Sequence, residues 1–215
     1  MLGAVLLLPY VIAPLYNFGR PASTVMLWRR LTGARVERIY VPLERIARPL
    51  RLAVIIAEDG RFCAHYGVDF QEIQNAIADA DDLDDVRGGS TITQQVAKNL
   101  FLWGGRSFVR KALEFPLAIW IDLVMPKRRI LEIYLNVAQW GPNGEFGVEA
   151  GSRRAFGKSA ANVGAHEAAL LVAMLPNPVA RDARAPKPGL RRLAGLYAAR
   201  AGSASYADEC VRRAR

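Results

Sequence analysis

Residues 126–139, PKRRILEIYLNVAQ, show most clearly which kind of fold the chain adopts. Apolar side chains recur in this stretch every three or four residues, which places them on one face of a helix. Pro126 precedes the pattern, where it does not interrupt a helix. We therefore predict a helix that buries this face in a protein core. The side chains of the face are Ile130, Leu131, Tyr134 and Leu135.

Helical patterns continue on both sides of this stretch. Pro49 can occupy the first turn of one helix, and Asp69 and Glu72 have the spacing of a capping box at the start of another. Ser90 and Ser107 can cap the two stretches that follow them. No alternation of strands and helices and no internal repeat is evident, so we predict a mainly α-helical fold. The expected helices cover residues 50–59, 71–80, 91–103, 108–125, 127–139 and 165–175.

The composition limits the classes of protein that remain. The chain has 215 residues, 52% of them hydrophobic, which is enough for one globular domain whose core needs no disulfide or metal. Two cysteines, Cys63 and Cys210, exclude a disulfide framework and a four-thiolate zinc site, and leave open whether the two are joined. The net charge of +9 favours anionic partners such as nucleic acid, acidic lipid headgroups or phosphorylated substrates.

The N-terminal stretch MLGAVLLLPYVIAPLYNF, residues 1–18, carries no charged side chain. Its length is close to the ~20 apolar residues that cross a bilayer, so we predict a transmembrane anchor there. A buried core helix, or a spanning segment that starts further upstream, is the alternative. Residues 19–42 are expected to be a linker with a β-like piece at 38–41, and residues 43–215 to be the folded domain.

The candidate chemistry of the chain lies in its carboxylates. The two histidines, His65 and His166, are too far apart in sequence to suggest a zinc site, and neither accompanies a nucleophile motif. Glu58 and Asp59 end an apolar helical stretch, where a carboxyl group is a candidate for a raised pKa. Glu114 ends the sequence RKALE, in which basic residues precede it on the same helix. Taken singly, Glu58 and Asp59 fit a solvated helix end as well as a catalytic site. Glu114, taken singly, fits better an ordinary surface ion pair with Arg110.

Four motifs occur together in a fixed order. Residues 58–69 read EDGRFCAHYGVD, 87–101 read RGGSTITQQVAKNLF, 110–114 read RKALE and 127–136 read KRRILEIYLN. This set resembles the motifs of the peptidoglycan glycosyltransferases, and the similarity extends over about residues 41–178. Because these residues show no second catalytic domain, the chain is similar to the monofunctional biosynthetic enzymes and not to the bifunctional penicillin-binding proteins.

The resemblance implies a lysozyme-like helical domain with a small, flexible, membrane-facing lobe, preceded by the N-terminal transmembrane helix. Two positions depart from the family pattern. Ala155 stands where the family more often has tyrosine, and the run DADDLDD at 79–85 is acidic where many relatives are basic. Neither departure touches an expected catalytic group, but the acidic run bears on how the lobe meets the membrane.

The resemblance also implies the reaction and the groups that perform it. The family joins lipid II units: the 4-hydroxyl of the acceptor GlcNAc attacks the anomeric carbon of the donor MurNAc, and undecaprenyl pyrophosphate leaves. By motif position Glu58 is the catalytic base, and Glu114 is a second catalytic carboxylate that either orients the donor or binds a divalent cation. No cofactor is required, although Mg or Mn is compatible with the site. The substrate-binding positions are Asp59, Ser90, Gln94, Gln95, Lys98, Arg106 and Lys111, the pyrophosphate ligands being Lys98 and Arg106.

Lipid II, the growing glycan strand and the membrane are the expected partners. Penicillin-binding and cell-division proteins are candidates, and nucleic acid is not expected. The positive-inside rule alone, applied to the arginines after residue 18, would place the body in the cytoplasm. The resemblance overrides this and implies a single-pass inner-membrane protein with a periplasmic catalytic domain. Apolar residues 100–103 and Phe108 then belong either to the core or to the membrane interface.

Other functions stay open at this point. A muramidase or lytic transglycosylase would use a helix-borne glutamate on the same polymer, but it has no use for pyrophosphate-binding cations such as Lys98. A membrane-tethered scaffold for cell-division proteins would need neither Glu58 nor Glu114. DNA binding ranks behind both, because the arginines are scattered and no recognition helix is evident.

Overall fold

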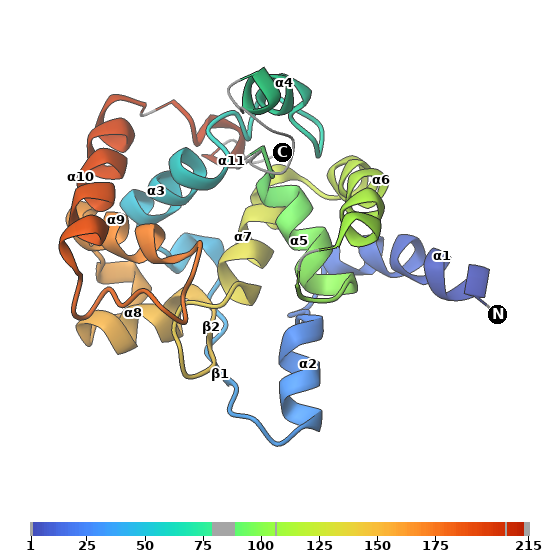
Figure 1. Ribbon diagram of the computed structural model, residues 1–215, viewed down its shortest axis with the longest axis horizontal. Helices are drawn as coiled ribbons and strands as arrows, with labels where there is room; N and C mark the ends of the chain where they lie inside the picture. The colour runs from blue at the N-terminus through green and yellow to red at the C-terminus, as the bar shows by residue number, and fades with distance from the viewer. Residues whose placement is uncertain (1, 79–88, 106, 205, 213–215) are drawn as a thin grey trace.

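The computed structural model describes residues 2–78, 89–105, 107–204 and 206–212, and this part of the chain is mainly helical (Figure 1). The predicted helical class is therefore confirmed. The acidic run at 79–85 and Arg106 lie outside the described residues. The helices are α1 (Leu2–Ile12), α2 (Thr24–Leu31), α3 (Arg48–Glu58), α4 (Phe70–Ala78), α5 (Ile92–Phe101), α6 (Phe108–Val124), α7 (Lys127–Val137), α8 (Val148–Phe156), α9 (Ala165–Met174), α10 (Pro188–Ser203) and α11 (Glu209–Arg212).

Helix α7, which contains the stretch that led us to predict a helical fold, packs against α5 and α11 and lies at the centre of the molecule (Figure 1). Its predicted apolar face is buried, and Ile133 and Val137 are buried as well, so its last turns are enclosed on all sides. Each such side chain contributes about 1.5–3 kcal/mol by leaving water. Asn136 stabilises the enclosed end by bonding both backbone groups of Val41 at 2.9 Å.

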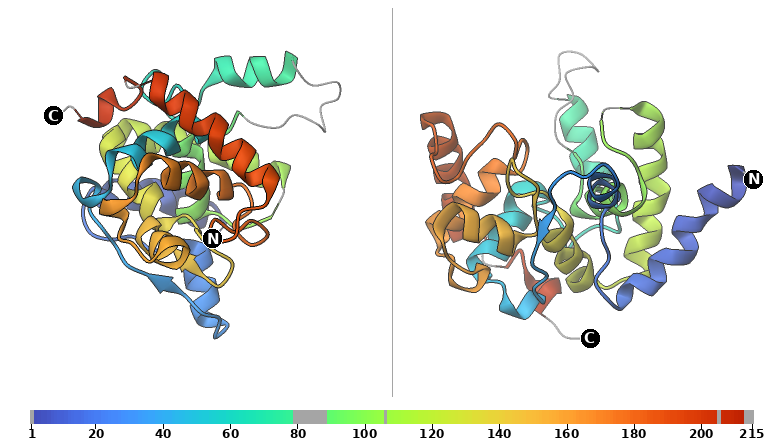
Figure 2. Two further views of the ribbon diagram at one scale, coloured as in Figure 1. Left: turned by 90° about the vertical axis from the view of Figure 1, so that its left-hand side faces the viewer. Right: turned by 90° about the horizontal axis from the view of Figure 1, so that it is seen from below.

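Helix α9 is the second buried helix, and it fixes the position of α3. It is apolar on nearly every side and packs against α3 and α10, which in turn contact each other (Figures 1 and 2). We did not expect α10 from the sequence, because its small and basic residues give a weak apolar stripe in which only Leu190 and Ala194 are buried. Helix α3, which ends at Glu58, is thus packed against two neighbouring helices.

Two short strands connect the N-terminal part of the chain to the body. β1 (Glu37–Arg38) pairs in parallel with β2 (Glu145–Phe146), with Glu37 opposite Glu145. The β-like piece expected at 38–41 therefore shares only its first residue with the observed strand. The expected linker at 19–42 also contains helix α2, which Ser23 caps by accepting a hydrogen bond from the Met26 N–H at 3.1 Å.

The helix ends confirm two of the predicted caps and correct a third. Asp69 accepts from the Glu72 N–H at 3.1 Å, and Ser107 caps α6. Thr91, and not Ser90, caps α5, in a capping box with Gln94. The hydroxyl of Ser90 instead accepts a hydrogen bond from Nζ of Lys111, on α6, at 2.7 Å.

No helix in the described part of the chain is both long and apolar enough to cross a membrane. The transmembrane helix expected over residues 1–18 is therefore not found. Helix α1 ends at Ile12, because Pro14 has no N–H to continue it, and a 3₁₀ turn follows at residues 13–17. Helix α1 lies against α6, where the indole N–H of Trp120 donates to the Tyr10 carbonyl at 2.9 Å (Figure 2).

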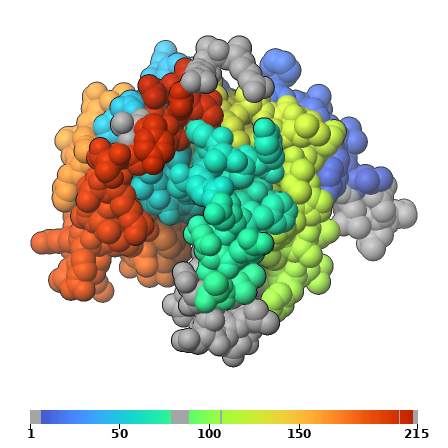
Figure 3. Space-filling view, turned by 90° about the horizontal axis from the view of Figure 1, so that it is seen from above, coloured from blue at the N-terminus to red at the C-terminus, as the bar shows by residue number. Residues whose placement is uncertain are grey.

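Helix α4 is a small projection on the surface of the molecule. It lies between α10 and α6 in the view from above, and none of its residues is buried (Figure 3). The expected division into a helical body and a small membrane-facing lobe stays a prediction.

Candidate active site

Glu58, the last residue of α3, is half-buried beside α5. Its Oε2 accepts a hydrogen bond from Nε2 of Gln95 at 2.9 Å, and Oε1 of Gln95 accepts one from the buried hydroxyl of Tyr134 at 3.2 Å. Burial raises the pKa of Glu58, while the Gln95 hydrogen bond and the positive charge of Lys98 oppose the rise. A carboxylate with a raised pKa is a stronger base, so Glu58 is suited to accept a proton from a substrate.

Asp59 ties the loop after Glu58 to the start of α5. Its carboxylate accepts hydrogen bonds from His65 Nε2 at 2.9 and 3.1 Å and from the backbone N–H of Ile92 at 2.9 Å. The bond to Ile92 satisfies one of the N–H groups that a helix N-terminus leaves without an internal partner. Because Asp59 is buried, these contacts give it a positioning role, and its expected contact with substrate stays a prediction.

The loop rejoins the body at Gly67, where the backbone has a φ of +78°. A Cβ atom there would lie 2.4 Å from the carbonyl oxygen of Ala118 on α6, so this close approach requires glycine. The Gly67 N–H donates to the carboxylate of Asp122 at 2.7 Å, and the Gly67 carbonyl accepts from the Thr91 hydroxyl at 2.6 Å. Asp122 also accepts from Lys127 Nζ at 2.7 Å. The loop that carries Asp59 and His65 is therefore fixed at both ends.

Three basic side chains interact with one another: Lys98 from α5, and Arg110 and Lys111 from α6; of these, Lys98 also interacts with Glu58. Burial lowers the pKa of Lys98, the charge of Arg110 lowers it further, and Glu58 raises it. Burial and the charges of Arg110 and Lys98 lower the pKa of Lys111 to about 8. These cations are destabilised by dehydration and by one another, so the cluster favours binding of an anion with more than one negative charge.

Glu114 holds two members of this cation cluster in place. Arg110 Nη1 contacts Glu114 Oε1, and Lys111 Nζ lies 3.4 Å from Glu114 Oε2. Lys111 Nζ also donates to the Ser90 hydroxyl at 2.7 Å. Because Arg110 and Glu114 are both buried, the pair is not the exposed surface ion pair that its spacing alone would suggest.

The structure brings most of the predicted site residues into two groups. Arg110 interacts with both, because its charge acts on Lys98 in one group and it contacts Glu114 in the other. Gln94, by contrast, is fully buried and caps α5, so its expected contact with a sugar stays a prediction. Arg106 lies outside the described residues. One group comprises Glu58, Gln95 and Lys98, and the other comprises Ser90, Lys111 and Glu114.

Tyr134 was not among the predicted site residues, and Arg110 was expected only to support the charge network beside Lys111. The sequence places Arg110 one turn before Glu114 but does not show that the pair is buried. Tyr134 was assigned only to the apolar face of its helix. A usable signal was present, because a buried tyrosine hydroxyl needs a hydrogen-bond partner and so indicates a polar neighbour.

Comparison with known proteins matches residues 25–197 to a family model described as Transglycosylase. The chain belongs to this transglycosylase family. Relatives called biosynthetic peptidoglycan transglycosylase include one from Nitrobacter hamburgensis, which is 59% identical over 93% of this chain and 88% of its own. A relative of the same description from Rhodopseudomonas palustris is 57% identical over 99% of this chain and 89% of its own. One from Agrobacterium fabrum is 49% identical over 97% and 92%.

The match to the transglycosylase family covers every predicted site residue, from Glu58 to Glu114. The donor set at Glu114 does not fit a resident divalent cation, because its two oxygens already face Arg110 and Lys111. The described residues also contain no group of three or more His, Cys, Asp or Glu side chains able to hold a metal ion together.

Proposed function

We propose that this protein is a peptidoglycan transglycosylase that polymerises lipid II into β-1,4-linked glycan strands, with inversion at the MurNAc anomeric carbon. One observation carries the proposal: Glu58, a carboxylate with a raised pKa, lies beside Lys98, which belongs to a cluster of partly dehydrated cations. The reaction needs a base for the attacking hydroxyl and positive charge for the departing pyrophosphate. The descriptions of the relatives support the same activity.

Glu58 acts on the acceptor in this proposal. As the 4-hydroxyl oxygen of the acceptor GlcNAc attacks the anomeric carbon, its proton passes to the Glu58 carboxylate. The Tyr134 hydroxyl donates to the amide oxygen of Gln95, so the Gln95 NH₂ group must face Glu58 Oε2. This hydrogen-bonded chain fixes the orientation of the carboxylate and leaves its other oxygen, Oε1, to take the proton.

The cation cluster acts on the donor. When the bond between the anomeric carbon and the pyrophosphate oxygen breaks, the electron pair stays on undecaprenyl pyrophosphate, whose negative charge increases. Lys98, Arg110 and Lys111 stabilise that charge in a partly dehydrated setting, where electrostatic attraction is stronger than in water. Arg106 joins them by motif position, and Ser90 orients Lys111 through their hydrogen bond.

Glu114 orients this cluster and does not carry a metal ion. Its contacts with Arg110 and Lys111 fix both cations where the pyrophosphate would bind. We accordingly propose that the reaction requires no resident cofactor. Turnover that persists in the presence of a chelator would support this assignment, and complete loss that added Mg²⁺ or Mn²⁺ restores would contradict it.

The same cluster argues against the other functions. A muramidase or lytic transglycosylase positions a water or an intramolecular hydroxyl at its glutamate and releases no pyrophosphate, so a cluster of three partly dehydrated cations would only destabilise it. A scaffold without catalysis would not need the hydrogen-bonded chain from Tyr134 through Gln95 to Glu58. The geometry therefore favours synthesis over cleavage or passive tethering.

We further propose that the protein works at the inner membrane, with the catalytic domain in the periplasm and residues 1–18 as its anchor. Large exposed apolar side chains on α1 and the turn after it, on α2 and on α6, together with Trp103, support a lipid-facing surface, because a polyisoprenoid substrate stays in the bilayer. Leu100 and Leu102 belong to the core instead. The exposed side chains are Leu7, Leu8, Val11, Leu15, Phe18, Leu27, Trp28, Leu31, Trp103, Phe108, Ile119 and Leu123.

The deciding experiment incubates purified protein with labelled lipid II in detergent or in vesicles and separates the products by size. Long glycan that a muramidase digests, formed without cleavage of finished peptidoglycan, is the expected result. Release of fragments from finished peptidoglycan, with lipid II unchanged, would instead assign the protein to the cleaving enzymes. Binding of penicillin-binding or cell-division proteins stays a separate proposal, testable by copurification from crosslinked cells.

A further inference from the structure

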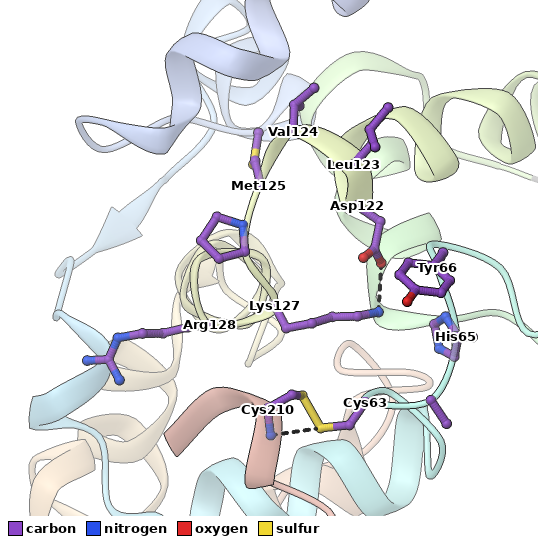
Figure 4. Close-up of a pocket in the computed structure, with 12 residues that line it drawn as sticks. Cys63, His65, Tyr66, Asp122, Leu123, Val124, Met125, Lys127, Arg128 and Cys210 are labelled. Atoms are coloured by element: carbon purple, nitrogen blue, oxygen red, sulfur yellow. Dashed lines mark hydrogen bonds and ion pairs between the residues drawn. A yellow bond between two sulfur atoms is a disulfide. The ribbon is translucent and has the colours of Figure 1, made fainter. Parts of the chain in front are cut away.

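A disulfide joins the loop after Glu58 to the C-terminal helix. Cys63 lies in the segment between Asp59 and Gly67, and Cys210 lies in α11. The two residues are 147 positions apart in sequence, and their Cα atoms are 5.5 Å apart. The bond therefore connects the loop between α3 and α4 to α11, five residues beyond the proposed catalytic base in sequence (Figure 4).

The C-terminal segment is seated on the body by contacts on both sides of Cys210. The buried carboxylate of Asp208 accepts hydrogen bonds from Arg48, at the start of α3, at 3.0 and 3.1 Å. The Val211 carbonyl accepts from Arg128 on α7 at 3.3 Å, and the Val211 side chain is buried. This segment consequently contacts both α3 and α7, and its preceding helix, α10, lies along α3.

The loop at the other end of the disulfide positions the active site. Two residues after Cys63, His65 bonds Asp59, and Asp59 bonds the Ile92 N–H at the start of α5. Helix α5 carries Gln95 and Lys98, which contact the proposed base and form part of the cation cluster. A displacement of the loop at Cys63 would therefore be transmitted to the groups that act on both substrates.

The disulfide is also accessible to another protein. Cys63 is exposed and Cys210 is half-buried, and both line one side of a cavity of about 910 Å³ that Tyr66, Asp122 and Lys127 also line (Figure 4). No predicted site residue lines this cavity, so a reagent at the disulfide would not need to enter the active site. Exposed disulfides exchange with thiolates, whereas buried ones resist attack.

We propose that Cys63 and Cys210 form a redox clasp, a reversible disulfide that holds the loop of residues 59–67 in its active position. This role rests on the function proposed above. The two thiols lose two protons and two electrons to the disulfide of a protein thiol–disulfide oxidase, which becomes a dithiol as the clasp closes. A dithiol reductant reverses the exchange and opens the clasp. Closure requires an oxidising compartment, which agrees with a periplasmic catalytic domain.

The test compares oxidised protein with protein reduced by dithiothreitol, and uses the Cys63→Ser/Cys210→Ser double variant as a control that dithiothreitol cannot change. Thiol counting by alkylation establishes the state, hydrogen exchange reports on residues 59–67 and 206–212, and the lipid II assay reports on turnover. We expect reduction to accelerate exchange in both segments and to slow polymerisation several-fold. The double variant should match the reduced protein with and without dithiothreitol.

Two results would contradict the proposed role of the disulfide. One is two free thiols in protein isolated from an oxidising compartment. The other is faster exchange only in 206–212 after reduction, with residues 59–67 and turnover unchanged, because the disulfide would then tether the C-terminus alone. Oxidised protein that never polymerises lipid II would contradict the proposed function instead, and hydrogen exchange at the loop would still decide whether the clasp holds it.

Discussion

Replacing Lys111 by methionine tests whether the cation cluster is destabilised in the way the structure indicates. The pKa of Lys111 is lowered from 10.5 to about 8 by burial and by neighbouring charges. Between these two pH values the unfolded chain binds the proton and the folded protein does not, so stability rises with pH in this window. Methionine keeps much of the length of the side chain and removes the proton, so the variant should lack this rise.

The size of the effect follows from the two pKa values. Their difference lowers the free energy of unfolding by about 3 kcal/mol at low pH. About 2 kcal/mol of this loss is regained between pH 7 and pH 9.5. The Lys111 side chain is 37% exposed, and screening by solvent reduces the expected gain to about 1 kcal/mol. Urea unfolding at both pH values measures the gain in the free energy of unfolding for wild type and Lys111→Met.

The same titration should appear in turnover with the opposite sign. Loss of the Lys111 charge above pH 8 weakens donor binding, so kcat/KM of the wild type should fall by up to about 15-fold from pH 8 to pH 9.5. Lys111→Met should be slow and should lack this component. Lys158→Met, which removes an exposed lysine outside the site, is the matched control. If Lys111→Met kept both pH dependences of the wild type, our description of the cluster would be wrong.

Three further substitutions test other parts of the site. Glu58→Gln should lower kcat by about 10²–10⁴-fold while lipid II binding, measured by filter retention, stays near that of wild type; retained turnover would exclude Glu58 as the base. Gln95→Leu removes a hydrogen bond to the Glu58 carboxylate, so the pKa of Glu58 should rise and the acidic limb of the kcat/KM profile should move to higher pH. Asp122→Ala leaves Lys127 without its carboxylate partner and releases Gly67, and urea unfolding should show a loss of about 3–5 kcal/mol; a loss below about 1 kcal/mol would contradict the anchoring role.

Local signals in the sequence were reliable where a residue and its neighbours on the same element decide the outcome. The periodicity of residues 126–139 predicted α7 and its buried face, and the caps at Asp69 and Ser107 were found where expected. The same signals failed where a tertiary contact competes. Thr91, and not Ser90, caps α5, and the Ser90 hydroxyl accepts a hydrogen bond from Lys111, which comes from a different helix.

The transmembrane helix predicted over residues 1–18 is not found in the part of the chain that the structure describes. An uncharged stretch of suitable length predicted a transmembrane helix over residues 1–18, but the helix ends at Ile12, ahead of Pro14, and packs against α6. Hydropathy gives the length of the apolar segment but not the length of the helix within it, which the proline shortens. Helix α2 escaped prediction because it is short and only Met26 among its side chains is buried.

The amino-acid sequence by itself determined the helical class and the set of acidic, basic and amide groups available for chemistry, because periodicity and side-chain type are local properties. The tertiary structure alone decided that the Arg110–Glu114 pair is buried, that Lys111 has a pKa of about 8, that Asp59 anchors α5, and that Cys63 meets Cys210. These properties depend on the distances between residues that are far apart in sequence and on how far their side chains are removed from water. Both are set only when the helices pack together.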